Sequence, residues 1–376
     1  MNILHIASYD GNIGDVANHK GFWRLFTKYV TDNYSVIPFE IRQFYQNWND
    51  TTFDLSFVEY MNSFDLVVFG GGRFFDIAVP NSRTGVTIDL PQFLIENLTV
   101  PTIFNGIGLR LSVRSTAEMK ERFSSFFRSL DKENIIVSLR NDNSTAYLSY
   151  LDKELIKDVH IIPDGGFFTA ARKYKHIELP ENKKVLAINI AKDSLDLRWN
   201  NSVEQYERYC IRMSDFIQTF LKEYDWNIVF VPHIPNDLEA INDIIRLLPD
   251  KLIRTRITVA PYLNGTVTNG DYIIDLYRQA ELVIAMRYHA NICSMAMGTP
   301  VISIMTLDDN RLLFDNIKEK SSYVDITSDG WQTDLFYVVE ETISNSKIIS
   351  AEYNSMINDL EKMCVPYFNE IKTKLL

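Results

Sequence analysis

Two short apolar segments joined by a helix of small residues constrain the fold of this chain more than any other feature. Residues 282–286 and 301–305 are apolar throughout and are typical of buried strands. Between them the sequence predicts a helix at about 290–297, ended by Gly298-Thr299-Pro300. A buried strand, a helix and a second buried strand in succession favour a parallel sheet covered by helices.

The same alternation of short apolar runs and helical periods repeats along the chain. We predict further strands at 2–7, 35–40, 66–69, 102–105, 135–139, 160–162, 185–191, 227–231 and 257–259, and helices at 18–33, 90–96, 116–129, 144–151, 203–223, 236–247, 271–279 and 349–376. This order predicts an α/β fold of two Rossmann-like domains with mostly parallel sheets, facing each other across a cleft.

Charge and a proline interrupt the apolar rhythm at 173–184 and separate the two predicted domains. The first domain is expected at 1–178 and the second at 182–345. A helical segment at 346–376 is expected to pack back on the first domain. At 376 residues the chain is long enough for two hydrophobic cores.

Composition excludes several classes of function. The formal net charge of −11 argues against a broad nucleic-acid surface, which would need a basic face. The three cysteines are far apart and without metal spacing, so we expect packed thiols, a reducing cytoplasm and no metal. The chain has no membrane-spanning run and begins without a signal-peptide pattern. We therefore expect a cytoplasmic protein, which includes the inner face of the membrane.

Arg287, Tyr288 and His289 follow the predicted strand 282–286 and precede a helix. In an open α/β sheet, ligands bind at the carboxyl ends of the strands, and a helix N-terminus favours anions. An arginine suits a carboxylate or a phosphate, and a histidine can move a proton near neutral pH. We interpret this turn as an anion-binding acid/base site; the alternative is that the two residues are only surface or capping groups.

Glycines mark the turn after the first predicted strand, where Gly11 and Gly14 flank Asn12-Ile13 and precede Asp15. Glycine lets the backbone approach a ligand closely, and Asp15 could orient a sugar hydroxyl, act as a base or cap the helix. The turn is neither a dinucleotide fingerprint nor a phosphate-binding P-loop, so neither NAD nor ATP is indicated.

Other strand ends carry similar candidates. They are Gly71 and Gly72 after 66–69, Asn105 after the next strand, Arg140 after 135–139, and His233 after 227–231. The glycines are explained as well by a tight turn as by a ligand, and a lone His233 is more often structural. Together these groups predict one binding site built from both domains.

These motifs, taken in order, resemble the polysaccharide pyruvyl transferase family. The resemblance rests on the Gly-Asn-Ile-Gly-Asp run at 11–15, the glycines at 70–72, Asn-Gly-Ile-Gly at 105–108, the run Ser-Leu-Arg-Asn-Asp-Asn-Ser at 138–144, Arg-Tyr-His at 287–289 and Gly-Thr-Pro at 298–300. It implies a fold like that of GT-B glycosyltransferases, and a bacterial enzyme of surface-polysaccharide biosynthesis.

The resemblance also implies a reaction. Members transfer pyruvate from phosphoenolpyruvate to two hydroxyls of a sugar as a ketal, without a cofactor. Arg140, Arg287 and His289 then fall on the positions that grip the donor, with Tyr288, Gly14, Gly71, Gly72, Asn105 and His233 as further substrate contacts. Two arginines fit a carboxylate and a phosphate. His289 is the expected proton-transfer group, and Asp15 is the second catalytic candidate. The acceptor is expected to be a saccharide, carried on a lipid or a nucleotide.

Two alternatives stay open at this point. A GT-B glycosyltransferase with a nucleotide-sugar donor would share the strand–helix–strand layout, because fold does not settle function. A non-catalytic relative would bind the sugar without turnover.

Overall fold

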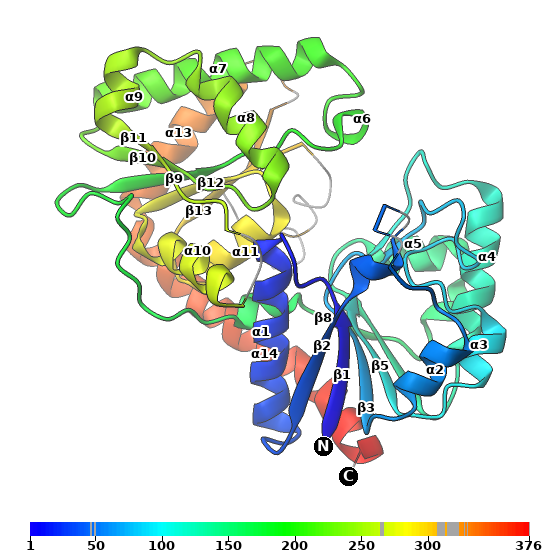
Figure 1. Ribbon diagram of the computed structural model, residues 1–376. Coiled ribbons are helices and arrows are strands. Elements are labelled where there is room, and N and C mark those ends of the chain that lie inside the picture. The colour runs from blue at the N-terminus through cyan, green and yellow to red at the C-terminus, as the bar shows by residue number, and fades with distance from the viewer. Residues whose placement is uncertain are drawn as a thin grey trace. The chain divides into compact units, whose positions relative to one another are not determined.

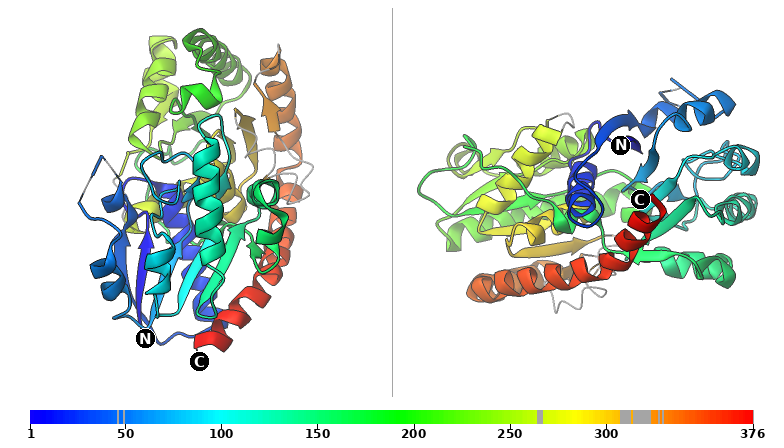
Figure 2. Two further views of the ribbon diagram at one scale, coloured as in Figure 1. Left: turned by 90° about the vertical axis from the view of Figure 1, so that its right-hand side faces the viewer. Right: turned by 90° about the horizontal axis from the view of Figure 1, so that it is seen from below.

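The computed structural model describes residues 1–375 except 46, 49, 264–266, 307–312, 314–322, 327 and 329, and Figures 1 and 2 show its ribbon. Contacts within the chain define two compact units. The first contains residues 1–10, 18–168 and 359–376, and the second contains 11–17 and 169–358. Each predicted domain is one continuous segment, whereas the two units are not. Residues 11–17 belong to the second unit, and residues 359–376 belong to the first.

The first unit is built on a six-stranded sheet with the order β2-β1-β3-β5-β7-β8, in which every paired strand runs parallel. Its strands are β1 (Asn2–Ala7), β2 (Ser35–Glu40), β3 (Leu66–Gly70), β5 (Thr102–Ile107), β7 (Ile135–Arg140) and β8 (His160–Ile162). A small parallel pair, β4 (Phe75–Asp76) and β6 (Leu109–Arg110), lies beyond the ends of β3 and β5.

Helices cover both faces of this first sheet (Figure 1). One face carries α2 (Leu55–Met61), α3 (Gln92–Glu96), α4 (Ala117–Ser129) and α5 (Ser144–Leu151), and the other carries α1 (Ile13–Tyr29) from Asn18 onward and the last part of α14 (Ser346–Leu375). The core between the sheet and α4 is largely aromatic, with Phe75 and Phe104 packed against Phe123 and Phe126. Their burial supplies the apolar area that stabilises the unit.

The second unit repeats this design with a sheet of order β11-β10-β9-β12-β13-β14, again parallel throughout. Its strands are β9 (Val185–Asn189), β10 (Asn227–Phe230), β11 (Ile257–Val259), β12 (Leu282–Ala285), β13 (Val301–Met305) and β14 (Tyr323–Asp325). Its helices are α6 (Leu195–Arg198), α7 (Val203–Glu223), α8 (Pro235–Ile245), α9 (Asp250–Arg256), α10 (Val267–Gln279), α11 (Tyr288–Ala296) and α13 (Trp331–Ser344). In chain order this sheet reads 3-2-1-4-5-6, the arrangement of dinucleotide-binding folds.

The α/β fold with two parallel sheets is therefore confirmed. Several predicted boundaries differ from the observed ones by a few residues, and one difference affects the site. The helix α1 begins at Ile13, not at Asn18, so Gly14 and Asp15 lie inside its first turn. The N-cap is Asn12, whose Oδ1 accepts from the backbone N–H of Gly14 at 3.0 Å, so Asp15 does not cap this helix. Among the described helices none is both long and apolar enough to cross a membrane.

Candidate active site

The second sheet changes the direction of its crossovers between β9 and β12, and ligands of such sheets bind at the carboxyl ends of the strands there. Asn189, the last residue of β9, is fully buried at this point. Its amide donates to the carbonyl of Val231 at 2.9 Å and accepts from the backbone N–H of Arg287 at 3.0 Å. Asn189 thus connects the carboxyl ends of β9, β10 and β12 by hydrogen bonds. It also fixes the backbone position of Arg287, which follows β12.

Two carboxylates hold the Arg287 guanidinium. Nε donates to both carboxylate oxygens of Asp237 at 2.9 and 2.7 Å, and Nη2 contacts Asp237 and, at 2.6 Å, Asp193. Burial alone would lower the pKa of Arg287, but the charges of Asp237 and Asp193 outweigh it and raise the pKa, so the side chain stays charged. Within the described residues Nη1 has no hydrogen-bond partner. That nitrogen remains available to a ligand.

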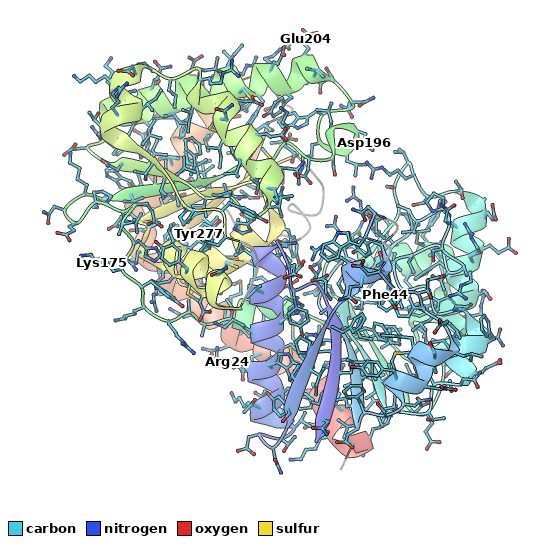
Figure 3. All side chains as sticks on the ribbon, viewed as in Figure 1. Arg24, Phe44, Lys175, Asp196, Glu204 and Tyr277 are labelled. Carbon is cyan, nitrogen blue, oxygen red and sulfur yellow. The ribbon has the colours of Figure 1, made fainter. Side chains whose placement is uncertain are left out.

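Asp237 also organises the start of α8. Its Oδ2 accepts from the backbone N–H groups of His233 at 2.9 Å and Ile234 at 3.3 Å. His233 is buried, and its Nε2 lies 2.7 Å from the hydroxyl of Tyr277 on α10 (Figure 3). Burial, then the nearby charges of Arg287 and His289, hold the pKa of His233 well below its usual value. In the second unit His233 is thus a neutral, enclosed residue behind Arg287.

The first turns of α1 and α11 meet at Gly14 and His289. A Cβ on Gly14 would lie 2.3 Å from Nδ1 of His289 and 2.5 Å from its Cβ, so no side chain fits there. The same segment contacts α10, because a Cβ on Gly270 would lie 2.4 Å from Val16. Gly14 therefore lacks a side chain to make room for the His289 ring. Two helix N-termini, each with a partial positive charge, converge on this histidine.

Tyr288 is the first residue of α11, with Arg287 as its N-cap. The Tyr288 ring stands edge-on to the His289 ring, with centroids 5.5 Å apart. Arg287, Tyr288 and His289 thus occupy successive positions at one helix N-terminus, as the sequence predicts.

The first unit holds Arg140 in a similar way, at the carboxyl end of β7. Its Nε donates to Asp142 at 2.7 Å and its Nη1 to Asp164 at 3.1 Å, and all three side chains are buried. Asp142 also accepts from the backbone N–H of Ser144, the first residue of α5, whose N-cap is Asn143. Gly108 leaves room for the guanidinium, since a Cβ there would lie 2.9 Å from Nη2.

Asn105 lies with Gly106 in a bulge of β5, between Phe104 and Ile107. The hydroxyl of Tyr367 on α14 donates to Oδ1 of Asn105 at 3.0 Å. Ser138 on β7 accepts from the backbone N–H of Gly106 at 2.8 Å, and Gly106 has a φ of +54°, a conformation that favours glycine. The C-terminal helix and β7 therefore fix this strand end.

The glycines after β3 are also explained by their neighbours. A Cβ on Gly71 would lie 1.7 Å from Oδ1 of Asn18, and one on Gly72 would lie 2.5 Å from the ring of Phe74. Close packing of these side chains requires glycine at both positions, whatever a ligand requires in addition.

Comparison with known proteins now decides the family. A family model described as polysaccharide pyruvyl transferase matches residues 12–308, and this range contains every candidate described above except Tyr367. The chain belongs to the polysaccharide pyruvyl transferase family. A search of curated proteins finds no match.

Solved structures support the same fold. A UDP-bound MnaA from S. aureus matches with 13% identity and a TM-score of 0.55, covering 94% of this chain and 90% of that one. A glycosyltransferase from Rickettsia africae matches with 11% identity and a TM-score of 0.55, covering 100% and 98%. The UDP-GlcNAc 2-epimerase from Methanocaldococcus jannaschii matches with 14% identity and a TM-score of 0.52, covering 90% and 92%. At these identities the likeness shows a GT-B-like fold alone.

The pyruvyl transferase candidates fall into two groups. Arg287, Tyr288, His289, His233, Gly14 and Asp15 belong to the second unit, and Arg140, Asn105, Gly71 and Gly72 belong to the first. A clamp formed by both groups across a cleft stays a prediction.

Several residues of the candidate site could not be predicted from the sequence. Asp193 and Asp237 lie 94 and 50 residues from Arg287, and no local spacing pairs them with it. Asp164 likewise reaches Arg140 only through the pairing of β7 with β8. Asp237 alone gave a local signal, as an acid in the first turn of a helix behind a strand end.

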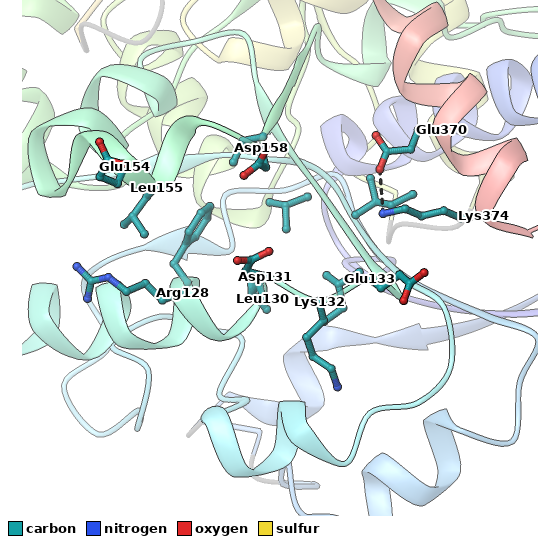
Figure 4. Close-up of a pocket in the computed structure, with 15 residues that line it drawn as sticks. Arg128, Leu130, Asp131, Lys132, Glu133, Glu154, Leu155, Asp158, Glu370 and Lys374 are labelled. Atoms are coloured by element: carbon teal, nitrogen blue, oxygen red, sulfur yellow. Dashed lines mark ion pairs between the residues drawn. The ribbon is translucent and has the colours of Figure 1, made fainter.

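A pocket of about 580 Å³ lies elsewhere in the first unit (Figure 4). It opens near the amino end of β7, between the end of α4 and the end of α14, away from the carboxyl edge of the sheet. Its charged lining consists of Asp131, Glu133, Glu154, Asp158, Glu370, Arg128, Lys132 and Lys374. Acids outnumber bases there, so this pocket is a poor site for an anionic donor.

Proposed function

We propose that this protein transfers pyruvate from phosphoenolpyruvate to two hydroxyls of one sugar in a surface-polysaccharide precursor, forming a pyruvate ketal. The family supports this proposal, because its description names pyruvyl transfer to polysaccharide. The proposed acceptor is a saccharide carried on a lipid or a nucleotide, and the proposed location is the cytoplasm, including the inner face of the membrane.

The observation that carries the proposal is the turn at the start of α11. There the charged Arg287 guanidinium, the His289 ring and the N-terminal ends of α1 and α11 lie within one unit. Phosphoenolpyruvate has two anionic ends, a carboxylate and a phosphate. Oriented donors and helix N-termini stabilise such charges with little reorganisation.

The proposed reaction balances without an oxidant or a cofactor. C3 of the donor gains a proton and the C2–C3 double bond becomes a single bond. Two bonds form from C2 to the sugar oxygens, and the bond from C2 to the phosphate oxygen breaks. Of the two hydroxyl protons, one is equivalent to the proton gained at C3 and the other leaves with phosphate. His289 is the proposed proton-transfer group, with Asp15 next to Gly14 as the second candidate.

Arg140 is the proposed second anion contact, on the first unit. Asp142 and Asp164 offset its charge, as Asp237 and Asp193 offset that of Arg287. Arg287 is the more exposed of the two, at 14% against 3%, and it lies at the N-terminus of α11. We therefore assign most of the donor affinity to Arg287 and the two helix N-termini. Arg140 would orient a group that lies against Gly108.

A nucleotide-sugar glycosyltransferase is the alternative, because the fold neighbours include a glycosyltransferase. Thermal unfolding in the presence of phosphoenolpyruvate, UDP, GDP or inorganic phosphate distinguishes pyruvyl transfer from glycosyl transfer. A ligand at 100 times its Kd stabilises the folded protein by about 2.7 kcal/mol. The proposal expects stabilisation by phosphoenolpyruvate beyond that by phosphate at equal concentration. Stabilisation by UDP or GDP alone would contradict it and favour glycosyl transfer.

A further inference from the structure

The first sheet has its own change of crossover direction, between β1 and β3. In this order of strands, ligands bind at the carboxyl ends of the two strands that flank the change. Tyr9 follows β1 there, and Gly70 ends β3. All the contacts described below lie within the first unit.

Glu40, the last residue of β2, fixes the loop that carries Tyr9. Its Oε2 accepts from the backbone N–H groups of Tyr9 at 2.6 Å and Asp10 at 2.8 Å. Its Oε1 accepts from Arg42, through the backbone N–H at 3.0 Å and the guanidinium at 3.2 Å. The carboxylate is buried and fully engaged, so it serves to hold the loop.

His5, inside β1, fixes the side chain of Tyr9. The Tyr9 hydroxyl and Nδ1 of His5 share a hydrogen bond. The His5 ring is fully buried and meets the rings of His19 and Trp23 edge-on, at 4.8 and 5.2 Å between centroids. Burial, then the charge of His19, keeps the pKa of His5 well below its usual value, so the ring is neutral. Burial, then Glu40, raises the pKa of Tyr9, so the phenol also stays neutral.

The neighbouring strand β3 ends in glycine. A Cβ on Gly70 would lie 2.0 Å from Nε2 of His5, so glycine is required at this position. Nε2 of His5 has no hydrogen-bond partner among the described residues. Tyr9 is thus a partly exposed residue at the carboxyl end of β1, with its loop held by two backbone hydrogen bonds to Glu40 and its hydroxyl held by His5.

We propose that Tyr9 contacts the acceptor saccharide, with its ring against a sugar face and its hydroxyl hydrogen-bonded to a sugar hydroxyl. His5 is the positioning residue that orients this hydroxyl. The inference rests on the proposed function, which supplies a neutral, hydroxyl-rich acceptor. A tyrosine has an apolar body and a polar tip, which matches a sugar ring with its C–H patches and hydroxyls. Because Tyr9 is already fixed, ordering it on binding costs little entropy.

Ligand-observed NMR tests this contact without turnover. The probes are methyl β-D-galactopyranoside and methyl β-D-glucopyranoside. Each glycoside is titrated into the protein, and its binding is measured by saturation transfer from the aromatic protons of the protein. Tyr9→Phe keeps the ring and should weaken binding of the bound glycoside about two- to tenfold, the usual effect of one neutral hydrogen bond. Tyr9→Ala should weaken it by more than Tyr9→Phe does. Tyr150→Phe, an exposed tyrosine at the end of α5, is the matched control and should bind as the parent does.

His5 variants separate positioning from simple folding damage. His5→Asn places an amide near the position of Nδ1 and should retain most of the affinity. His5→Leu removes that group and should match Tyr9→Phe in glycoside affinity and in KM for the glycoside, with kcat changed less. Folding of each variant is checked by thermal unfolding.

Unchanged glycoside affinity in both Tyr9 variants, or no binding of either glycoside to the parent, would overturn the proposal. Failure of the proposed function has a different signature. The glycosides could bind in a Tyr9-dependent way while phosphoenolpyruvate neither binds nor releases phosphate. That result would support the contact between Tyr9 and the sugar and would contradict pyruvyl transfer.

Discussion

Arg287 shows how one residue combines a structural and a binding role. Three of its contacts go to Asp237, a fully buried carboxylate that also caps α8, and one goes to Asp193. Removing Arg287 would leave Asp237 buried and unpaired, which typically costs about 3 to 5 kcal/mol of stability. An alanine variant therefore confounds folding with binding. The more informative change is at the partly exposed partner.

Asp193→Asn should strengthen binding of phosphoenolpyruvate. Asp193 is 28% exposed and places a negative charge 2.6 Å from Nη2 of Arg287, beside the proposed donor site. Removing this charge should favour an anion by about 1 kcal/mol, roughly a fivefold change in Kd. Isothermal titration calorimetry measures the change. Asp250→Asn, at an exposed pair on α9, makes the same change of charge elsewhere and should leave Kd unaltered. A weaker or unchanged affinity in Asp193→Asn would place the donor elsewhere.

At the scale of elements, the meeting of α1 with α11 is the decisive packing contact in the second unit. An alanine normally stabilises a helix by about 1 kcal/mol relative to glycine. Gly14→Ala should do the opposite, because the new methyl group would lie 2.3 Å from the His289 ring. Overpacking of this kind typically costs about 1 to 3 kcal/mol. The displaced histidine should also lose its position beside the donor.

A double-mutant cycle checks this element contact by urea unfolding. His289→Gly removes all the atoms that clash with the new methyl group. In that background Gly14→Ala should become neutral or stabilising, since only its helix preference remains. If Gly14→Ala stabilises the parent itself, the two helix ends do not pack as described.

Helices and strands with a strong periodic pattern were predicted accurately from the sequence. Features that depend on contacts between distant residues were predicted poorly. The predicted strands 2–7, 35–40, 160–162, 257–259 and 301–305 and the helices 144–151 and 203–223 have the observed bounds. The start of α1 was wrong because Asn12 caps the helix earlier than the apolar pattern suggests. The short elements α2, α6, α9, β4, β6 and β14 were missed, since few residues give little periodic signal. The longer helix α13 was missed as well.

Only some residues of the candidate site could be predicted from the sequence. The strand-end arginines and His289 could be found, because parallel strands bring their carboxyl ends to one edge. The carboxylate partners of Arg287 could not be paired with it, since Asp193 and Asp237 lie far away in the chain. Nor could Tyr367 be predicted as the partner of Asn105, which is 262 residues away.

At the scale of the whole molecule, two histidines are buried and neutral, one in each unit. The pKa values of His5 and His233 in the folded protein lie well below the ordinary value of 6.5. Below about pH 6.5 the unfolded chain binds protons that the folded protein does not. The free energy of unfolding should therefore be highest above this pH and fall as the pH drops, by about 1 kcal/mol per histidine between pH 7 and 5.5.

Urea unfolding of the parent and of His233→Gln at these two pH values measures the effect. The variant lacks one titrating group and should show a smaller loss on acidification by about 1 kcal/mol. Equal losses in the two proteins would mean that His233 is not held neutral in the folded state.

The most direct test of the central claim is phosphate release from phosphoenolpyruvate, with a methyl hexoside as acceptor, by the parent and by His289→Asn across pH. Asparagine can still hydrogen-bond at the start of α11 but cannot exchange a proton near pH 7. We expect donor binding to persist and acceptor-dependent turnover to fall by about 10²-fold or more. Near-parental turnover with an unchanged pH profile would contradict the account and leave Asp15 or His233 as the proton-transfer group.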